Sequence, residues 1–186
     1  FTHVGATRDD AAGESFDMVA RVLGIPYPGG KELQKLADAY SGGDCYALPS
    51  PALRDSLYDF SFSGLKTAVI NLDHRLSQIG ETLNREKLAA SFCKIVQEGL
   101  CDRLQNLVSN APVQTLVFAG GVAANEGLRS AIKTFCDQSG VRFCPVDAVF
   151  CGDNAAMIAS QGYYEYLAGV RAKSDLNASA RAEIET

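Results

Sequence analysis

Residues 116–129 read LVFAGGVAANEGLR, and this stretch carries the clearest structural signal in the chain. The run QTLVFA at 114–119 is short and continuously apolar, which is typical of a buried strand of a parallel sheet. Gly120 and Gly121 then lead into a helix that we expect over residues 125–138. Such a junction offers free backbone N–H groups at the positive end of a helix dipole, which suits a phosphate or a nucleotide.

Asn125 stands at the start of that helix, and its chemistry allows two roles. It is a good N-cap residue, and its amide could also bond the ribose or the base of a nucleotide. The stretch is neither a G-x-G-x-x-G fingerprint nor a P-loop, so neither of those sites is indicated. From the pattern alone, both roles of Asn125 stay open.

The elements around this stretch indicate an α/β fold. A second short strand is expected at 141–144 and a last helix at 153–167, whereas residues 1–8 are expected to form a short strand or its end. Apolar stripes predict further helices at 11–23, just after Gly30, at 64–78 and at 85–109. A long connection at 41–62 carries enough apolar residues to be packed, and residues 171–186 are expected to be a loosely ordered tail.

The composition is that of an ordinary globular protein. Of the 186 residues, 47% are hydrophobic and 21% are charged, and no apolar run is long enough to span a membrane. The net charge of −5 gives no general attraction for nucleic acid, so such a partner would need a local patch or another subunit. Six cysteines without C-x-x-C spacing indicate reduced cytosolic thiols. Because Phe1 opens a polar stretch with neither an initiator Met nor a signal sequence, we expect a fragment.

Two acidic stretches are candidates for ligand binding. In CGDNAAMIAS, residues 151–160, Asp153 is either the N-cap of the last helix or a ligand for a metal or phosphate region. One carboxylate alone cannot hold a transition metal. In DDAAGESFD, residues 9–17, the first two acids are expected to cap the first helix, whereas Asp17 could bind ribose hydroxyls.

Four motifs of the chain together resemble the TsaD (Gcp/YgjD) family of tRNA N6-adenosine threonylcarbamoyltransferases. In order, they are DDAAGESFDMVARVLGIPYPGG, DFSFSGLKTAV, LVFAGGVAANEGLR and CGDNAAMIASQGYY, within residues 6–168. Each motif alone is a weak sign, but their order and spacing together are specific. The chain is similar to the C-terminal half of such a protein.

The resemblance implies an actin-like ATPase fold (ASKHA or ribonuclease H-like) with two lobes and a helical insertion. Residues 1–170 would be the C-terminal portion of that fold, with the insertion at about 11–110 and a nucleotide-binding strand–helix part at about 113–168. The family transfers a threonylcarbamoyl group from threonylcarbamoyl-AMP to N6 of adenosine 37 in tRNAs that read ANN codons. It works with TsaB-like and TsaE-like subunits, and a cytoplasmic location without membrane contact is expected.

The resemblance also implies roles for individual residues. By motif, Asp17, Gly30 and Asn125 would bind the threonylcarbamoyl adenylate, and Asp153 would be a ligand of one divalent metal ion. Fe²⁺ is expected and Zn²⁺ is the alternative, and the other two ligands would be histidines of an H-x-x-x-H motif that this chain lacks. No catalytic residue is assigned. We therefore expect the chain alone to be inactive, and we expect its truncated sheet to leave an edge that invites a homodimer.

Two other functions stay open for a chain with these motifs. One is a non-catalytic actin-fold scaffold subunit of the same complex, which would need no metal aspartate, so Asp153 in its C-G-D-N context speaks against it. The other is a small-metabolite kinase of the same fold, which would take its catalytic base from outside this chain.

Overall fold

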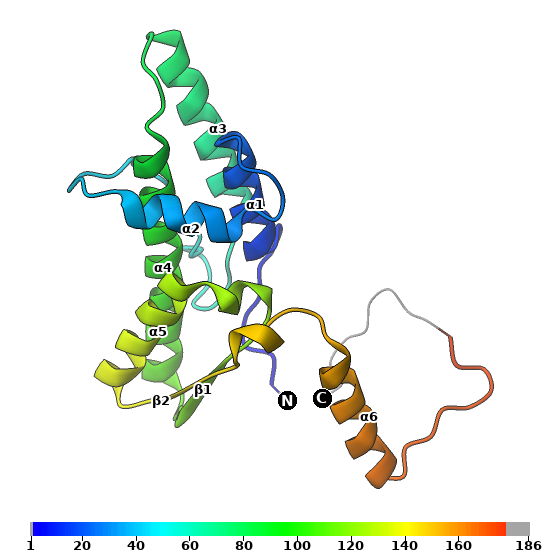
Figure 1. Ribbon diagram of the computed structural model, residues 1–186. Coiled ribbons are helices and arrows are strands. Elements are labelled where there is room, and N and C mark those ends of the chain that lie inside the picture. Colours follow the sequence, from blue (N-terminus) through cyan, green and yellow to red (C-terminus); the bar gives the residue numbers. More distant parts are fainter. Residues whose placement is uncertain (1, 178–186) are drawn as a thin grey trace.

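The computed structural model describes residues 2–177, and this part of the chain is an α/β protein in which helices predominate (Figure 1). The helices and strands are α1 Ala12–Val22, α2 Gly30–Ala39, α3 Ser63–Gln78, α4 Arg85–Asn110, β1 Thr115–Phe118, α5 Glu126–Ser139, β2 Arg142–Pro145 and α6 Ala155–Leu167. Two short 3₁₀ turns, η1 Gly121–Ala124 and η2 Ala148–Phe150, complete them. None of these helices combines the length and the apolar character that crossing a membrane requires. The predicted α/β class is confirmed.

The first four helices share one apolar core. α2 lies across α4, and α1 packs against both α2 and α3 (Figure 1). Each helix buries one face because apolar residues recur at spacings of three and four, as Leu88, Phe92 and Val96 do in α4. The rings of Phe16 and Phe92 meet edge to face with their centroids 5.0 Å apart. Burial of a side chain such as that of Phe92 contributes about 1.5–3 kcal/mol to the stability of the fold.

β1 and β2 form a parallel pair, and α5 is the crossover that joins them. The register places Thr115 opposite Arg142. Ile132 and Cys136 of α5 are buried in a second, smaller core against this sheet. Within residues 2–177 neither strand has a further neighbour, and Val117 of β1 is 65% exposed. The sheet therefore presents open edges.

The start of the chain is not the strand that the sequence predicts. Residues 2–8 form one isolated bridge, between Thr7 and Phe60, and Phe1 lies outside the described residues. The backbone N–H and C=O groups of Phe60 each bond this segment at 2.9 Å. Residues 2–8 thus pair with the connection at 41–62. Because only Phe60 of that connection forms backbone bonds to them, no strand ladder develops.

The connection at 41–62 is packed, as its apolar residues predict. Phe62, at its end, lies in the main core. Arg103 of α4 is buried, and its guanidinium donates hydrogen bonds to the carbonyl oxygens of Leu53 and Ser56, both at 2.6 Å. These bonds fix the connection against α4.

Asp9 caps α3 instead of the first helix, which corrects the prediction. The N-cap residue of α1 is Ala11, which has no side-chain acceptor. Oδ1 of Asp9 accepts hydrogen bonds from the backbone N–H groups of Phe62 and Ser63 at 2.8 and 3.3 Å, and Oδ2 accepts from the hydroxyls of Ser61 and Ser63 at 2.5 and 2.6 Å. Partial burial raises the pKa of this carboxyl, but the four hydrogen bonds outweigh it and hold the pKa well below its usual range.

α6 stands apart from the helical core (Figure 1). None of its residues is buried, and several large apolar side chains on it are more than half exposed: Met157, Ile158, Tyr163, Tyr164, Tyr166 and Leu167. Of the predicted tail at 171–186, residues 178–186 lie outside the described residues. An exposed apolar helix of this kind marks a surface that another chain or segment covers.

Candidate functional site

One cleft brings together three of the four predicted site residues. It lies between α1, the first turns of α2 and the η1 turn before α5, and its volume is about 900 Å³. Asp17, Gly30 and Asn125 all line it, although Asn125 is far from the other two in the sequence. The size and the mixture of apolar walls with a few polar groups suit a small organic ligand. Further lining residues include Gly13, Phe16, Pro28, Lys31, Gln34, Val122, Ala124 and Ala148.

Asp17 orders the turn that begins α2. Its Oδ1 accepts a hydrogen bond from the backbone N–H of Gly29 at 2.8 Å, whereas its Oδ2 bonds none of the described residues. Gly29 approaches α1 so closely that a Cβ built on it would lie 2.2 Å from the Cβ of Ala20. One carboxylate oxygen therefore holds the turn, and the other is left to accept a hydrogen bond from a ligand.

The first turn of α2 offers positive charge to the cleft. No side chain caps this helix, so its first N–H groups are left without intrahelical partners at the positive end of the dipole. Gly30 leaves open space, because a Cβ built there meets nothing within 4 Å. Lys31 forms no ion pair with the described residues, whereas Lys35 pairs with Glu32 at 2.7 Å. An anionic group that approaches the backbone here meets Lys31, although four carboxylates line the cleft against two lysines: Glu14, Asp17, Asp38 and Glu126 with Lys31 and Lys35.

Asn125 is the N-cap of α5, so the structural interpretation of this residue is confirmed. Its Oδ1 accepts a hydrogen bond from the backbone N–H of Leu128 at 2.8 Å. The helix does not begin at Gly121, because the η1 turn starts at that residue and runs to Ala124 before α5. The Nδ2 group of Asn125 bonds none of the described residues, so the same side chain can cap the helix and still donate to a ligand in the cleft.

Gln34 lines the cleft and is a residue that sequence reasoning missed. Its Nε2 donates to Oδ1 of Asp38 at 2.8 Å, whereas its Oε1 is buried and has no hydrogen-bond partner among the described residues. A buried amide oxygen without a donor is costly, and this one lies toward Gly127 of α5, 2.8 Å from where a Cβ built on that residue would be. The signal that could have identified it is its position one turn after Gly30, on the same face of α2.

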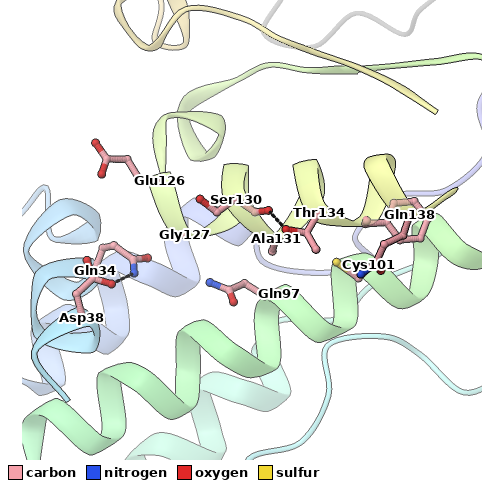
Figure 2. A pocket seen from close by; sticks show the side chains of 11 residues that line it. Gln34, Asp38, Gln97, Cys101, Glu126, Gly127, Ser130, Ala131, Thr134 and Gln138 are labelled. Atoms are coloured by element: carbon pink, nitrogen blue, oxygen red, sulfur yellow. Dashed lines mark hydrogen bonds between the residues drawn. The ribbon is translucent and has the colours of Figure 1, made fainter. Parts of the chain in front are cut away.

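A second hollow lies on the other side of Gln34, between α2, α4 and α5 (Figure 2). Its volume is about 690 Å³, and Gln34, Asp38 and Glu126 line both hollows. Amide and hydroxyl groups from Gln97, Ser130 and Thr134 dominate its walls, and Thr134 uses its hydroxyl to bond the carbonyl oxygen of Ser130 at 2.9 Å. None of the predicted site residues and no Lys or Arg lines this hollow. Its charged lining residues, Asp38 and Glu126, are both acidic and also line the cleft, where Lys31 and Lys35 lie as well.

Asp153 lies outside the cleft, in the short exposed segment before α6. It is not the N-cap of that helix, so this interpretation is wrong. The cap is Asn154, whose Oδ1 accepts from the backbone N–H of Met157 at 3.0 Å. Local pattern could not decide between two adjacent residues that both cap helices well. The carboxylate of Asp153 is left exposed.

The described residues do not by themselves fit a metal centre. Among residues 2–177, no three His, Cys, Asp or Glu side chains lie together in a way that could hold an ion. All six cysteines are free thiols, and burial raises the pKa of the Cys93 thiol to about 12, which keeps it protonated. Asp153 can supply one oxygen ligand, which is too few for a transition metal.

Sequence comparison identifies the relatives of the chain. The family model described as "TsaD: tRNA N6-adenosine threonylcarbamoyltransferase" matches residues 1–160. Curated proteins with the name tRNA N6-adenosine threonylcarbamoyltransferase are 43% identical over 185 residues in Staphylococcus haemolyticus, 45% over 186 in Ligilactobacillus salivarius and 43% over 185 in Bacillus subtilis.

These matches cover 100%, 100% and 99% of this chain, but 54%, 54% and 53% of the respective relatives. The chain thus spans about half the length of the curated relatives it matches. The family match covers most of the chain and includes all the residues that line the cleft and Asp153. The chain therefore belongs to the TsaD family of tRNA N6-adenosine threonylcarbamoyltransferases.

Proposed function

We propose that the full-length protein makes threonylcarbamoyladenosine in tRNA. It transfers the threonylcarbamoyl group of threonylcarbamoyl-AMP to N6 of adenosine 37 in tRNAs that read ANN codons. The observation that carries this proposal is that Asp17, Gly30 and Asn125, from three separate elements, line one cleft in a chain of the TsaD family.

Each of the three residues has a group left over for the adenylate. The free Oδ2 of Asp17 can accept hydrogen bonds from ribose hydroxyls. The backbone at Gly30 lets the nucleoside come close, and the Nδ2 of Asn125 can donate to it. The first turn of α2, with Lys31, favours the negative phosphate.

The transfer reaction needs orientation above all. The N6 amine of the tRNA base attacks the carbamoyl carbon, a C–N bond forms, and the bond from that carbon to the phosphate oxygen breaks. AMP leaves, and N6 loses a proton. The residues of this chain bind and orient the adenylate, so their contribution to the rate is one of positioning. No residue of this chain is proposed as the general base.

Asp153 is proposed as one ligand of a divalent metal, Fe²⁺ or Zn²⁺, whose other donors come from outside this chain. Its exposure in the segment before α6 leaves the carboxylate accessible to such donors. Because the described residues supply only this ligand, we assign no chemical step to the ion. The chain alone is expected to bind metal weakly and to be inactive.

The proposal extends to architecture and partners. The chain would form part of an actin-like fold with two lobes, and the full-length protein would act in the cytoplasm with TsaB-like and TsaE-like subunits. The net charge of −5 means that the tRNA would be held mainly by other segments or subunits. The open sheet edge and the exposed apolar face of α6 favour a homodimer of the isolated chain, which sedimentation across a concentration series would detect.

Nucleoside mass spectrometry on tRNA tests the proposed function. The reaction contains the full-length protein, its partner subunits, threonylcarbamoyl-AMP and unmodified tRNA. We expect threonylcarbamoyladenosine from the unaltered protein and from the control variant Asp175→Ala, which changes an exposed acid elsewhere. We expect none from Asp153→Ala. Absence of product from the folded, fully partnered protein would favour a scaffold, and ATP-dependent phosphorylation of a metabolite would favour a kinase.

A further inference from the structure

Arg129 links three points of the chain that are separate in the sequence. It lies in the first turn of α5, and its Nε donates to the carbonyl oxygen of Ala123 at 2.5 Å. One terminal nitrogen donates to the carbonyl oxygen of Val146 and also lies 3.1 Å from Sγ of Cys151. A planar guanidinium can reach several acceptors at once in a fixed geometry, which a lysine cannot.

Each of these points belongs to the functional region. Ala123 lies in the η1 turn, whose neighbouring residues Val122 and Ala124 line the cleft. The segment 146–154 contributes Ala148 to the same cleft and leads to Asp153, two residues after Cys151. Arg129 therefore stands between the wall of the cleft and the proposed metal ligand.

The segment 146–154 has few other attachments to the body of the chain. Among the described residues, two side chains outside the segment hydrogen-bond to it: Arg129, and Met157 of the adjoining α6, whose Sδ accepts from Nδ2 of Asn154 at 3.6 Å. The backbone adds one bond, from the N–H of Val146 to the carbonyl oxygen of Phe118 at 3.0 Å. Val149 and Phe150 are more than half exposed, whereas Cys151, which Arg129 contacts, is buried. The segment therefore has few attachments to the body of the chain, and Arg129 makes two of them.

The positive charge of Arg129 strengthens hydrogen bonds that fix the position of the segment, and it is not part of an ion pair among the described residues. Arg129 forms no ion pair with the described residues, and the acceptors that it meets are carbonyl oxygens and a thiol. Charged donors form stronger bonds to such groups than neutral donors do. Arg129 is half-buried and has no carboxylate partner among the described residues, so its hydrogen bonds to the three acceptors hold its side chain in place.

We propose that Arg129 is a positioning residue that transmits occupancy of the cleft to the segment carrying Asp153. A ligand that orders the η1 turn would, through Arg129, order residues 146–153. This inference rests on the proposed function, because it takes the cleft to be the adenylate site.

Hydrogen–deuterium exchange on the full-length protein, with and without millimolar AMP, tests this coupling. The variants are Arg129→Met, Arg129→Lys and the control Lys133→Met. Lys133 lies one turn further along α5 and, among residues 2–177, forms its ion pair with Asp137 at 2.6 Å. In the unaltered protein and the control, we expect AMP to slow exchange in residues 146–153 by about tenfold. In both Arg129 variants we expect AMP to slow exchange at the cleft, Ala148 included, but not at residues 150–153, which do not line it.

Equal AMP-dependent protection of residues 150–153 in Arg129→Met would overturn the inference while leaving the cleft assignment intact. If AMP protects no part of the cleft in the unaltered protein, the cleft assignment fails, and the inference fails with it. Exchange in α4 reports on the fold itself. A general loss of protection there in both Arg129 variants would make Arg129 a core residue and would contradict the positioning role.

Discussion

Oδ1 of Asp17 lies 2.8 Å from the backbone nitrogen of Gly29, so the acid expected to bind the ligand also holds the turn from which α2 starts. Gly30, the next residue along, then lines the cleft beside Asp17. The bond ties α1 to α2 at the place where both meet the ligand. Stability and binding are therefore linked at this residue, and variants can separate them.

Asp17→Ala removes both the acceptor for Gly29 and the oxygen left for a ligand. We expect the free energy of unfolding to fall by about 1–2 kcal/mol and the affinity for AMP to fall about tenfold, because a charged acceptor is lost. Asp17→Asn keeps an oxygen for Gly29, so it should retain most of the stability and still bind AMP weakly. Urea unfolding and calorimetric titration measure the two effects. An unchanged unfolding midpoint for Asp17→Ala would show that the bond to Gly29 is unimportant.

Gly29 and Gly30 are neighbours with opposite tolerance for a side chain. A Cβ at Gly29 would lie 2.2 Å from the Cβ of Ala20, whereas a Cβ at Gly30 meets nothing within 4 Å. We expect Gly29→Ala to lower the free energy of unfolding by about 1–3 kcal/mol, since overpacking forces α1 and α2 apart. Gly30→Ala is the matched control and should change it by less than about 0.5 kcal/mol. Thermal unfolding of the pair decides the matter, and equal melting temperatures would contradict the close packing.

The two roles of Asn125 can also be separated. Asn125→Ala should lower the free energy of unfolding by about 1 kcal/mol, because the N–H of Leu128 loses its cap. Asn125→Asp keeps a capping oxygen but loses the amide donor, so it should fold normally and bind AMP poorly. Affinity and unfolding measurements on the same samples test this. Unaltered AMP affinity in Asn125→Asp would exclude the amide from ligand binding.

Asp9 predicts a dependence of stability on pH. Its hydrogen bonds hold the pKa of the folded state below the value of about 3.9 in the unfolded chain. The unfolded state therefore takes up the proton first, so the contribution of Asp9 is full above about pH 5 and is lost as the pH falls through the folded pKa. Asp9→Asn should lower stability at pH 7 and lower it less at pH 3, where the unfolded chain is mostly protonated at this position and the folded state is not, as judged by urea unfolding. A deficit that stays the same at both pH values would contradict this.

The fold could be predicted where its signals are local. The apolar run before Gly120 and the stripe of Leu88, Phe92 and Val96 are short-range patterns, and the strand and helix they predict are present. The η1 turn was missed because a single 3₁₀ turn has no hydrophobic period. Asp9 was assigned to the wrong helix because its partners lie in a distant segment that only the folded chain brings near. The division into an insertion at 11–110 and a nucleotide-binding part at 113–168 stays a prediction.

Only those site residues that belong to recognisable sequence motifs could be predicted. Asp17, Gly30 and Asn125 could be named from the sequence, but their convergence on one cleft required the packing of α1, α2 and η1. Gln34 was missed because an amide on a helix looks like any surface residue until its oxygen is found buried without a partner. The metal role of Asp153 stays a prediction.

The central claim is that the cleft beside Asp17, Gly30 and Asn125 binds the adenylate. The most direct measurement is an NMR titration of the 186-residue chain with AMP, which follows backbone amide shifts, together with the variant Gly30→Val. The valine side chain would occupy the open space at Gly30 without meeting the surrounding atoms at its Cβ. We predict saturable shifts at residues 29–31 and 121–128 in the unaltered chain, and their loss in the folded variant. Shifts confined to the hollow of Figure 2, or unchanged binding by Gly30→Val, would contradict the account.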